Sequence, residues 1–215
     1  MAKFLLSSPS VELCPPPTLP EFAFIGRSNV GKSSLMNMLM ADRLALTSGT
    51  PGKTKLLNWY QVKQANWIDL PGYGYARAGK EDRKAFAELI VDFFERRKTL
   101  VCTFVLIDIR HEALEIDLEF MEFLMEREVP FAIAFTKADK LKTSQVATHV
   151  QAYMNLLLTR WEGLPPHFAT SAEKRTGRDE MMAYIEELTV LGGGESSKAN
   201  ANRQAKKDEE YMEGN

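Results

Sequence analysis

Cysteine, net charge and long apolar runs are all scarce in this sequence. Only Cys14 and Cys102 occur among its 215 residues, and Cys102 lies within an apolar run. We therefore predict that Cys102 is a buried thiol and not half of a disulfide, as is usual in a reducing compartment. The formal net charge of −2 excludes a global attraction to nucleic acid or anionic membrane, although a local basic face can act under a neutral total.

No stretch approaches the ~18 consecutive apolar residues that a membrane-spanning helix needs. The longest apolar run, Leu100 to Ile107, suits a buried strand. The N-terminus carries one lysine and a very short apolar patch, so we predict no signal peptide and expect a cytoplasmic protein. What is present, 45% hydrophobic and 26% charged residues, is typical of a soluble globular protein.

Short apolar runs alternate with helix-like patterns through the middle of the chain. The helical period is clearest from Glu81 to Lys98, where apolar residues recur three and four positions apart. Strands that alternate with helices predict an α/β domain in three layers, with a doubly wound, mostly parallel sheet of six strands. The predicted strands cover Phe22 to Ile25, Leu56 to Val62, Trp67 to Leu70, Val101 to Ile107, Phe131 to Phe135 and His167 to Thr170.

The two ends of the chain differ from this middle part. Residues 1–20 contain five prolines and are predicted to form an extended lead-in, to which Phe4 to Leu6 can add an edge or capping contact. Residues 21–191 are predicted to form the folded domain. Residues 192–215 begin with three glycines and contain only two large apolar residues, so we predict a disordered tail.

The segment from Gly26 to Ser33 fits the phosphate-binding pattern G-x-x-x-x-G-K-[ST], with a predicted strand before it and a predicted helix after it. Gly26 and Gly31 allow a tight turn and a close approach of the backbone, whose N–H groups can face an anion. Lys32 would bridge β- and γ-phosphate oxygens, and the Ser33 hydroxyl would ligate Mg²⁺. The predicted phosphate-binding residues are Gly26, Arg27, Ser28, Asn29, Val30, Gly31, Lys32, Ser33 and Ser34.

A second motif, Asp69-Leu70-Pro71-Gly72, ends a predicted buried strand. Its position puts the Asp69 carboxylate at the mouth of the sheet, where it can hold the Mg²⁺ shell through water. The backbone N–H of Gly72 can contact a γ-phosphate. The loop before the second strand should add a threonine to the metal, and spacing alone leaves three candidates open. These are Thr47, Thr50 and Thr54.

A third motif, Thr136-Lys137-Ala138-Asp139, follows a predicted strand and points to guanine. The Asp139 carboxylate can accept hydrogen bonds from both N1–H and the exocyclic amine of guanine, and adenine lacks that donor pair. Lys137 can lay its aliphatic stem along the base, whereas Thr136 stands where many GTPases have asparagine. Three motifs in this order predict a GTPase. After the last strand, three residues are candidates for backbone contacts to the guanine oxygen: Thr170, Ser171 and Ala172.

Five stretches together resemble one family of P-loop GTPases. They are GRSNVGKSSLMN, TPGKT with LLNWY, DLPGYGYA, IDIRH and TKADK, and the likeness spans roughly Pro20 to Leu191. The sequence is similar to the EngB (YihA/YsxC-like) family of bacterial ribosome-assembly GTPases, within the TrmE-Era-EngA-EngB-Septin-like group. The resemblance makes residues 21–191 a G domain and Thr54 the Mg²⁺-ligating switch threonine, beside Ser33 and Asp69. It also assigns a switch segment to the nucleotide: Gly52, Lys53, Thr54, Lys55 and Leu56.

The resemblance further implies a biological role. It implies a GTP-dependent switch in assembly of the large ribosomal subunit, needed for normal cell division and septation. The expected partners are GTP or GDP, large-subunit assembly intermediates and rRNA, with no membrane, and the free protein is expected to be monomeric. Lys32, Thr54 and Gly72 would then carry the catalytic contacts.

Two residues bear on the rate of hydrolysis. Tyr73 follows Gly72 where Ras-like enzymes have the glutamine that orients the attacking water, so we expect slow intrinsic GTP hydrolysis. Asn29 resembles the P-loop asparagine of potassium-activated GTPases, which makes K⁺ a candidate activator. The alternative is that Asn29 serves the geometry of the turn.

Other interpretations stay open. A GTP-gated binding module would hardly need hydrolysis, and a metabolic kinase or ATPase would need an acceptor site or lid, for which we find no inserted subdomain.

Residues around the predicted switch segments form either a ribosome-docking face or a mixed solvated surface with partly buried aromatics. They are Trp59, Tyr60, Tyr73, Tyr75, Lys53, Lys55, Arg77, Lys80, Arg83 and Lys84.

Overall fold

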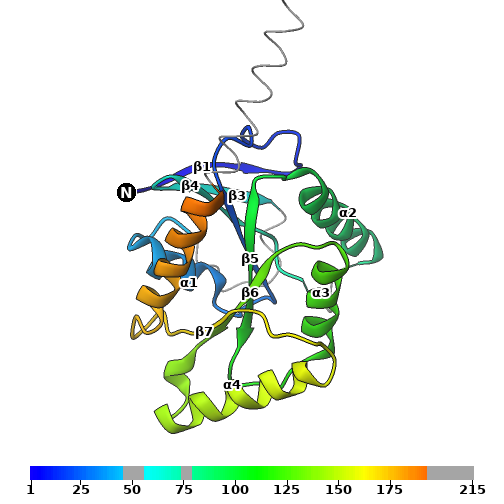
Figure 1. Ribbon diagram of the computed structural model, residues 1–215. Coiled ribbons are helices and arrows are strands. Elements are labelled where there is room, and N and C mark those ends of the chain that lie inside the picture. Colours follow the sequence, from blue (N-terminus) through cyan, green and yellow to red (C-terminus); the bar gives the residue numbers. More distant parts are fainter. Residues whose placement is uncertain (46–55, 74–78, 193–215) are drawn as a thin grey trace, which may run out of the picture.

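The computed structural model of the protein describes residues 1–45, 56–73 and 79–192 (Figure 1). The described helices are α1, α2, α3, α4, the short 3₁₀ helix η1, and a last helix from residue 178 to residue 192. The elements in chain order are β1 (Ala2–Ser8), β2 (Glu21–Gly26), α1 (Lys32–Met40), β3 (Leu57–Val62), β4 (Ala65–Asp69), α2 (Lys80–Arg96), β5 (Leu100–Asp108), α3 (Glu115–Glu126), β6 (Phe131–Thr136), η1 (Ala138–Lys140), α4 (Thr143–Leu158) and β7 (His167–Ala169).

One sheet organises the domain, with the strand order β1-β3-β4-β2-β5-β6-β7. The five strands from β4 to β7 in this order run parallel, and β3 pairs antiparallel with both β1 and β4. Helices cover both faces, because one buried apolar cluster contains residues of α2, α3 and α4 and the other contains residues of α1 and the last helix. The predicted three-layer, doubly wound α/β fold is confirmed.

The predicted number of strands is wrong by one. The described residues form a sheet of seven strands because β1 lies within the segment predicted to be a lead-in and pairs with β3 along its length. The Phe4 ring meets Tyr60 edge-on at 5.5 Å between centroids, yet Phe4 is 44% exposed. The register also shifts between Phe4 and Leu6. An exposed aromatic residue and a shifted register break the alternation by which a strand is recognised.

The sheet places the predicted motifs at one edge. Parallel strands bring their carboxyl ends together, and β2, β4, β5 and β6 end at Gly26, Asp69, Asp108 and Thr136. This is the edge at which open α/β sheets bind ligands. The loops that follow these four strands are therefore the candidate site.

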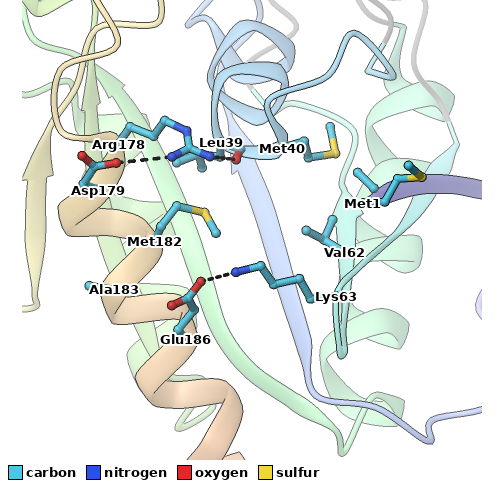
Figure 2. A pocket seen from close by; sticks show the side chains of 11 residues that line it. Met1, Leu39, Met40, Val62, Lys63, Arg178, Asp179, Met182, Ala183 and Glu186 are labelled. Carbon is cyan, nitrogen blue, oxygen red and sulfur yellow. Dashed lines mark hydrogen bonds and ion pairs between the residues drawn. The ribbon is translucent and has the colours of Figure 1, made fainter.

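The far end of α1 is anchored to the last helix. The Arg178 guanidinium donates hydrogen bonds to the carbonyls of Met38 and Leu39, at 3.0 and 3.1 Å. Figure 2 shows the bond from Arg178 to Leu39 beside the ion pair of Lys63 and Glu186; these residues line a pocket of about 340 Å³. Carbonyls at a helix C-terminus have no partner within the helix, so Arg178 supplies one and holds the helix that follows the P-loop.

The described residues also test the predictions about the cysteines, a membrane-spanning helix and the C-terminal tail. Both cysteines are free, and Cys102 is 1% exposed, which confirms the predicted buried thiol. Burial raises the pKa of Cys102 to about 12. In the described ranges, no helix combines the length and the apolar character that crossing a membrane requires. Of the predicted tail 192–215, only Gly192 is described, at the end of the last helix.

Candidate nucleotide-binding site

The P-loop connects the end of β2 to the start of α1, and glycine is needed at both of its ends. A Cβ on Gly26 would lie 2.8 Å from the carbonyl oxygen of Leu106, closer than real Cβ contacts. Gly31 has φ +105°, a left-handed conformation that side chains disfavour, and its carbonyl accepts the bond from the Leu35 N–H at 2.9 Å that starts the helix. The backbone therefore turns tightly with its amides at the edge of the sheet.

Lys32 and Asp69 meet at the mouth of the sheet. The Lys32 ammonium forms an ion pair with Oδ1 of Asp69, and their side chains are 12% and 5% exposed. Burial lowers the pKa of Lys32 to about 7, because an ammonium loses hydration there. A buried cation in this position gains strongly from an additional anion such as a phosphate.

The segment after Asp69 rests directly on the P-loop. Leu70 is fully buried and its N–H donates to the Phe24 carbonyl at 3.0 Å. A Cβ on Gly72 would lie 2.6 Å from the carbonyl oxygen of Gly26, so only glycine fits there. Pro71 is buried between these two residues. The Gly72 backbone thus lies against the loop that is predicted to hold the phosphates.

The loop after β6 is tied to the P-loop by two hydrogen bonds. The Thr136 hydroxyl donates to the carbonyl of Val30 at 2.6 Å, and the Lys137 ammonium donates to the carbonyl of Asn29 at 2.6 Å. Asn29 itself has φ 62°, a conformation that asparagine tolerates better than most residues. The threonine in the position of the expected asparagine therefore still joins the two loops.

Asp139 lies beside the loop that follows β7. The Ser171 hydroxyl donates to its Oδ1 at 2.7 Å, and the Lys140 ammonium lies 2.9 Å from its Oδ2. Loss of hydration raises the pKa of Asp139, but the hydrogen bonds from Lys140 and Ser171 outweigh it and the pKa is lowered. The carboxylate is consequently ionised at neutral pH, as an acceptor for two N–H donors must be.

A cavity of about 950 Å³, large enough for a nucleotide, lies on the base side of these loops, and Lys32, Asp69 and Gly72 are not among the residues that line it. It runs between the start of α1, the loop after β6 and the loop after β7. The predicted site residues that line it are Gly31, Ser34, Thr136, Lys137, Asp139, Thr170 and Ala172. Ala138 begins η1, and its N–H donates to the Thr170 carbonyl at 3.0 Å, which brings the two base-side loops together.

The sequence analysis missed Asp108, the last residue of β5. Asp108 is 6% exposed, its Oδ2 lies 2.9 Å from the Lys137 ammonium, and Arg110 donates to both of its oxygens at 2.9 and 2.7 Å. Burial raises its pKa, but the bonds from Arg110 and Lys137 hold the pKa well below its usual range. Its only signal was its place at the end of a strand within the IDIRH stretch.

Several predicted residues lie outside the described part of the chain. These are Thr47, Thr50, Gly52, Lys53, Thr54 and Lys55. Leu56, the last residue of the predicted switch segment, is described and is 37% exposed, directly before β3. The assignment of Thr54 to the metal therefore stays a prediction.

For three aromatic residues the predicted docking face is wrong, and the alternative of buried aromatics holds. Trp59, Tyr60 and Tyr73 are 0%, 2% and 4% exposed, so they belong to the core and cannot meet a partner. Side chains alternate along β3, so Trp59 packs in the apolar cluster that contains residues of α2, α3 and α4 and Tyr60 packs in the cluster on the opposite face. Tyr75, Arg77 and the Lys80 side chain lie outside the description, whereas Arg83 and Lys84 are exposed on α2.

Comparison with known proteins gives the family. A family model described as "50S ribosome-binding GTPase" matches residues 21–137. The "Probable GTP-binding protein EngB" of Flavobacterium psychrophilum is 55% identical over 191 residues, which cover 87% of this chain and 93% of that protein. The chain belongs to the EngB family of P-loop GTPases. The EngB protein of Phocaeicola vulgatus is 52% identical over 189 residues, with coverage of 87% and 94%.

Solved structures agree with this EngB assignment. A crystal structure of a "probable GTP-binding protein engB" superposes with a TM-score of 0.64 at 26% identity, covering 80% of this chain and 99% of that one. Era of Aquifex aeolicus bound to GDP and AlF₄⁻ has a TM-score of 0.65 at 21% identity, covering 80% and 57%, and shows the shared fold. As an EngB-family GTPase, the chain binds GTP and hydrolyses it to GDP and phosphate.

Proposed function

We propose that this protein is a GTP-dependent switch in assembly of the large ribosomal subunit. The observation that carries the nucleotide part is the position of Asp139, ionised and held by Ser171 at the edge of a cavity that begins at the P-loop. The ribosomal part is supported by the description of the matching family model, "50S ribosome-binding GTPase". The proposed partners are assembly intermediates and their rRNA, in the cytoplasm, with a role in normal cell division.

The proposed contacts follow from the loops. Backbone amides of residues 26–34 would hold the phosphates, Lys32 would turn from Asp69 toward the β- and γ-phosphates, and the Gly72 N–H would contact the γ-phosphate. Thr136 to Asp139 and Thr170 to Ala172 would hold the guanine. Residues 52–56 would contact the nucleotide.

The residues present suit Mg²⁺. Ser33 offers a hydroxyl in the first turn of α1, and Asp69 offers a buried carboxylate whose charge is balanced only by Lys32 among the described residues. Hard oxygen donors of this kind, together with substrate phosphates, are the usual Mg²⁺ ligands. Ser33, Asp69 and Thr54 would hold the ion, which when bound neutralises charge on the phosphate oxygens.

Slow intrinsic hydrolysis is part of the proposal. Tyr73, which stands where Ras-like enzymes have the glutamine that orients the attacking water, is buried and donates its hydroxyl to Asp117 at 2.9 Å. We propose that K⁺ bound near Asn29 accelerates the reaction, although the left-handed backbone at Asn29 accounts for asparagine without an ion. Equal GTPase rates in KCl and NaCl, with and without ribosomal particles, would remove the potassium part.

The ribosomal part is tested by sedimentation. The protein is centrifuged with ribosomal particles in GTP, in GDP and in a non-hydrolysable GTP analogue. We expect co-sedimentation with large-subunit precursors in GTP and in the analogue, and little in GDP. Equal co-sedimentation in all three nucleotides contradicts a nucleotide-dependent switch on the ribosome, and so does an absence of co-sedimentation in every one of them.

A second candidate is a GTP-gated binding module in which hydrolysis is nearly dispensable. This candidate is favoured by Tyr73, a buried tyrosine at the position after Gly72 where Ras-like enzymes have the glutamine that orients the attacking water. Single-turnover assays with and without precursor particles separate the two functions. Acceleration by particles supports the switch, and an unchanged rate supports the module.

A further inference from the structure

A buried carboxylate outside the predicted site joins the two segments that flank the phosphate region. Asp117 lies in the first turn of α3 and is 3% exposed. Its Oδ1 accepts the hydrogen bond from the Tyr73 hydroxyl at 2.9 Å, and its Oδ2 lies 3.8 Å from Nε of Arg27. Tyr73 directly follows Gly72, and Arg27 directly follows Gly26. One side chain of α3 therefore contacts both phosphate-region segments.

The backbones of these two segments also touch. Arg27 and Tyr73 form a parallel bridge, and a Cβ on Gly72 would lie 2.6 Å from the Gly26 carbonyl oxygen. The Tyr73 ring stacks on Phe120, one turn further along α3, with centroids 4.6 Å apart. Tyr73 is thus held at its ring and at its hydroxyl by the same helix. The Gly72 backbone cannot slide along the P-loop unless Tyr73 leaves α3.

Burial makes these contacts matter to Asp117 as well. Loss of hydration raises the pKa of Asp117, and the bond from Tyr73 and the charge of Arg27 offset only part of that rise. A buried carboxylate is strongly disfavoured without such partners. Among the described residues, Tyr73 supplies the one side-chain hydrogen bond to Asp117, so withdrawing Tyr73 is costly.

We infer that Asp117 is a positioning residue for the GTPase: by holding Tyr73 and Arg27 it sets the Gly72 N–H at the place where GTP is distinguished from GDP. Asp117 acts through its two partners and touches no phosphate itself. The inference rests on the proposed γ-phosphate contact of Gly72 and goes beyond it, because it assigns the placement of that contact to α3.

The test compares two affinities of the full-length protein. Tyr73→Phe removes the hydroxyl and keeps the ring stack, and Asp117→Ala removes both contacts. The affinities for a non-hydrolysable GTP analogue and for GDP are measured with Mg²⁺ present. We expect both variants to bind the analogue roughly three- to tenfold more weakly, with GDP affinity changed by less than about twofold. The double variant should be no worse than Asp117→Ala alone.

Tyr153 offers a matched control. Its side chain from α4 is 5% exposed in the same apolar cluster, and its hydroxyl has no hydrogen-bond partner within the described ranges. Tyr153→Phe makes the same chemical change without breaking a hydrogen bond to Asp117, whose charge the Tyr153 hydroxyl feels only through space, so it should leave the ratio of the two affinities unchanged. Asp117→Ala can fail to fold, in which case Tyr73→Phe decides.

The remaining outcomes each have a meaning. Equal weakening of both nucleotides in Tyr73→Phe, or no weakening of either, overturns the inference, since a merely structural contact does not change their ratio. Gly72→Ala separates the two proposals. If Gly72→Ala lowers the ratio of analogue affinity to GDP affinity and Tyr73→Phe does not, the role of Asp117 is wrong and the γ-phosphate contact of Gly72 stands. If neither lowers it, the γ-phosphate contact of Gly72 fails with it.

Discussion

At the scale of single residues, charge and short hydrogen bonds hold the base-side loop in place. Thr136 and Lys137 donate hydrogen bonds to the carbonyls of consecutive P-loop residues, each at 2.6 Å. The Lys137 ammonium also forms an ion pair with Asp108 at 2.9 Å. Asp139 lines the cavity, and one of its carboxylate oxygens accepts a hydrogen bond from the Ser171 hydroxyl. The loop is therefore anchored to the P-loop on one side and presents a carboxylate to the cavity on the other.

The choice of base is expected to depend on Asp139. Asp139→Asn replaces an acceptor of two N–H donors by an amide, so GTP affinity should fall on the order of a hundredfold and xanthosine triphosphate should bind better than GTP. Calorimetry with both nucleotides measures the change. Asp179→Asn is the control, because Asp179 is an exposed carboxylate outside the cavity lining. Wild-type protein that binds ATP as tightly as GTP contradicts the assignment.

Asp108 gives a pH dependence with a definite sign. Because its pKa is lower in the folded protein than in the unfolded chain, its stabilising effect is present above about pH 4 and is lost as the pH falls below that. Asp108→Asn should therefore lower the free energy of unfolding by roughly 1–3 kcal/mol at pH 7, and the difference from wild type should shrink toward pH 3. Urea unfolding at both pH values measures it, and a constant difference would contradict the origin in charge.

At the scale of elements, the edge strand β1 is separated from the P-loop strand. The order β1-β3-β4-β2 puts two strands between β1 and β2. β1 covers one edge of β3 and part of Tyr60, and it contributes nothing to the cavity lining. Stability and nucleotide binding are therefore expected to separate in this element.

Deletion of residues 2–8 tests that separation. The melting temperature should fall by several degrees because a full strand pairing is lost and the edge of β3 is exposed. GDP affinity at a temperature where the protein is folded should stay within about twofold of wild type. A large loss of GDP affinity in folded protein would show that β1 shapes the site after all.

The sequence predicted elements well where packing on both faces leaves a strong pattern. β2, β5 and β6 are buried strands bounded by loops, and α2 has its apolar stripe, so they were found with small errors at their ends. β1 was missed as a strand because its alternation is broken. Asp108 was missed because its role depends on Lys137, which is 29 residues away in the chain and joins it only across β5 and β6.

At the scale of the whole molecule, one arginine connects four segments. Arg97, at the end of α2, is 6% exposed and donates from Nε to Glu21 of β2 at 3.0 Å and from its terminal nitrogen to the Pro15 carbonyl at 2.9 Å. Its guanidinium also lies 4.8 Å from the Trp59 ring centroid in β3. The lead-in is thereby tied to the domain at the end of the sheet opposite the site.

Arg97→Ala is expected to destabilise the protein by about 3–5 kcal/mol, because it leaves the carboxylate of Glu21 buried without a partner. Arg96→Ala is the matched control: Arg96 is its exposed neighbour, and its surface ion pairs should contribute far less to stability than the buried pair of Arg97. Chemical unfolding of both variants measures the difference. Equal effects of the two substitutions would contradict a buried ion pair at Arg97.

The sequence by itself determined the family and its GTPase activity, because the P-loop, the Asp69–Gly72 segment and the Thr136–Asp139 segment are each recognisable in a few consecutive residues. Only the tertiary structure decided which side chains hold those segments in position. The contacts of Asp117, Asp108 and Arg97 join strands and helices that are distant in the chain. Their charges interact strongly only because the folded protein buries them. Local patterns cannot reveal such partners, since the contact exists only once the sheet has brought them together.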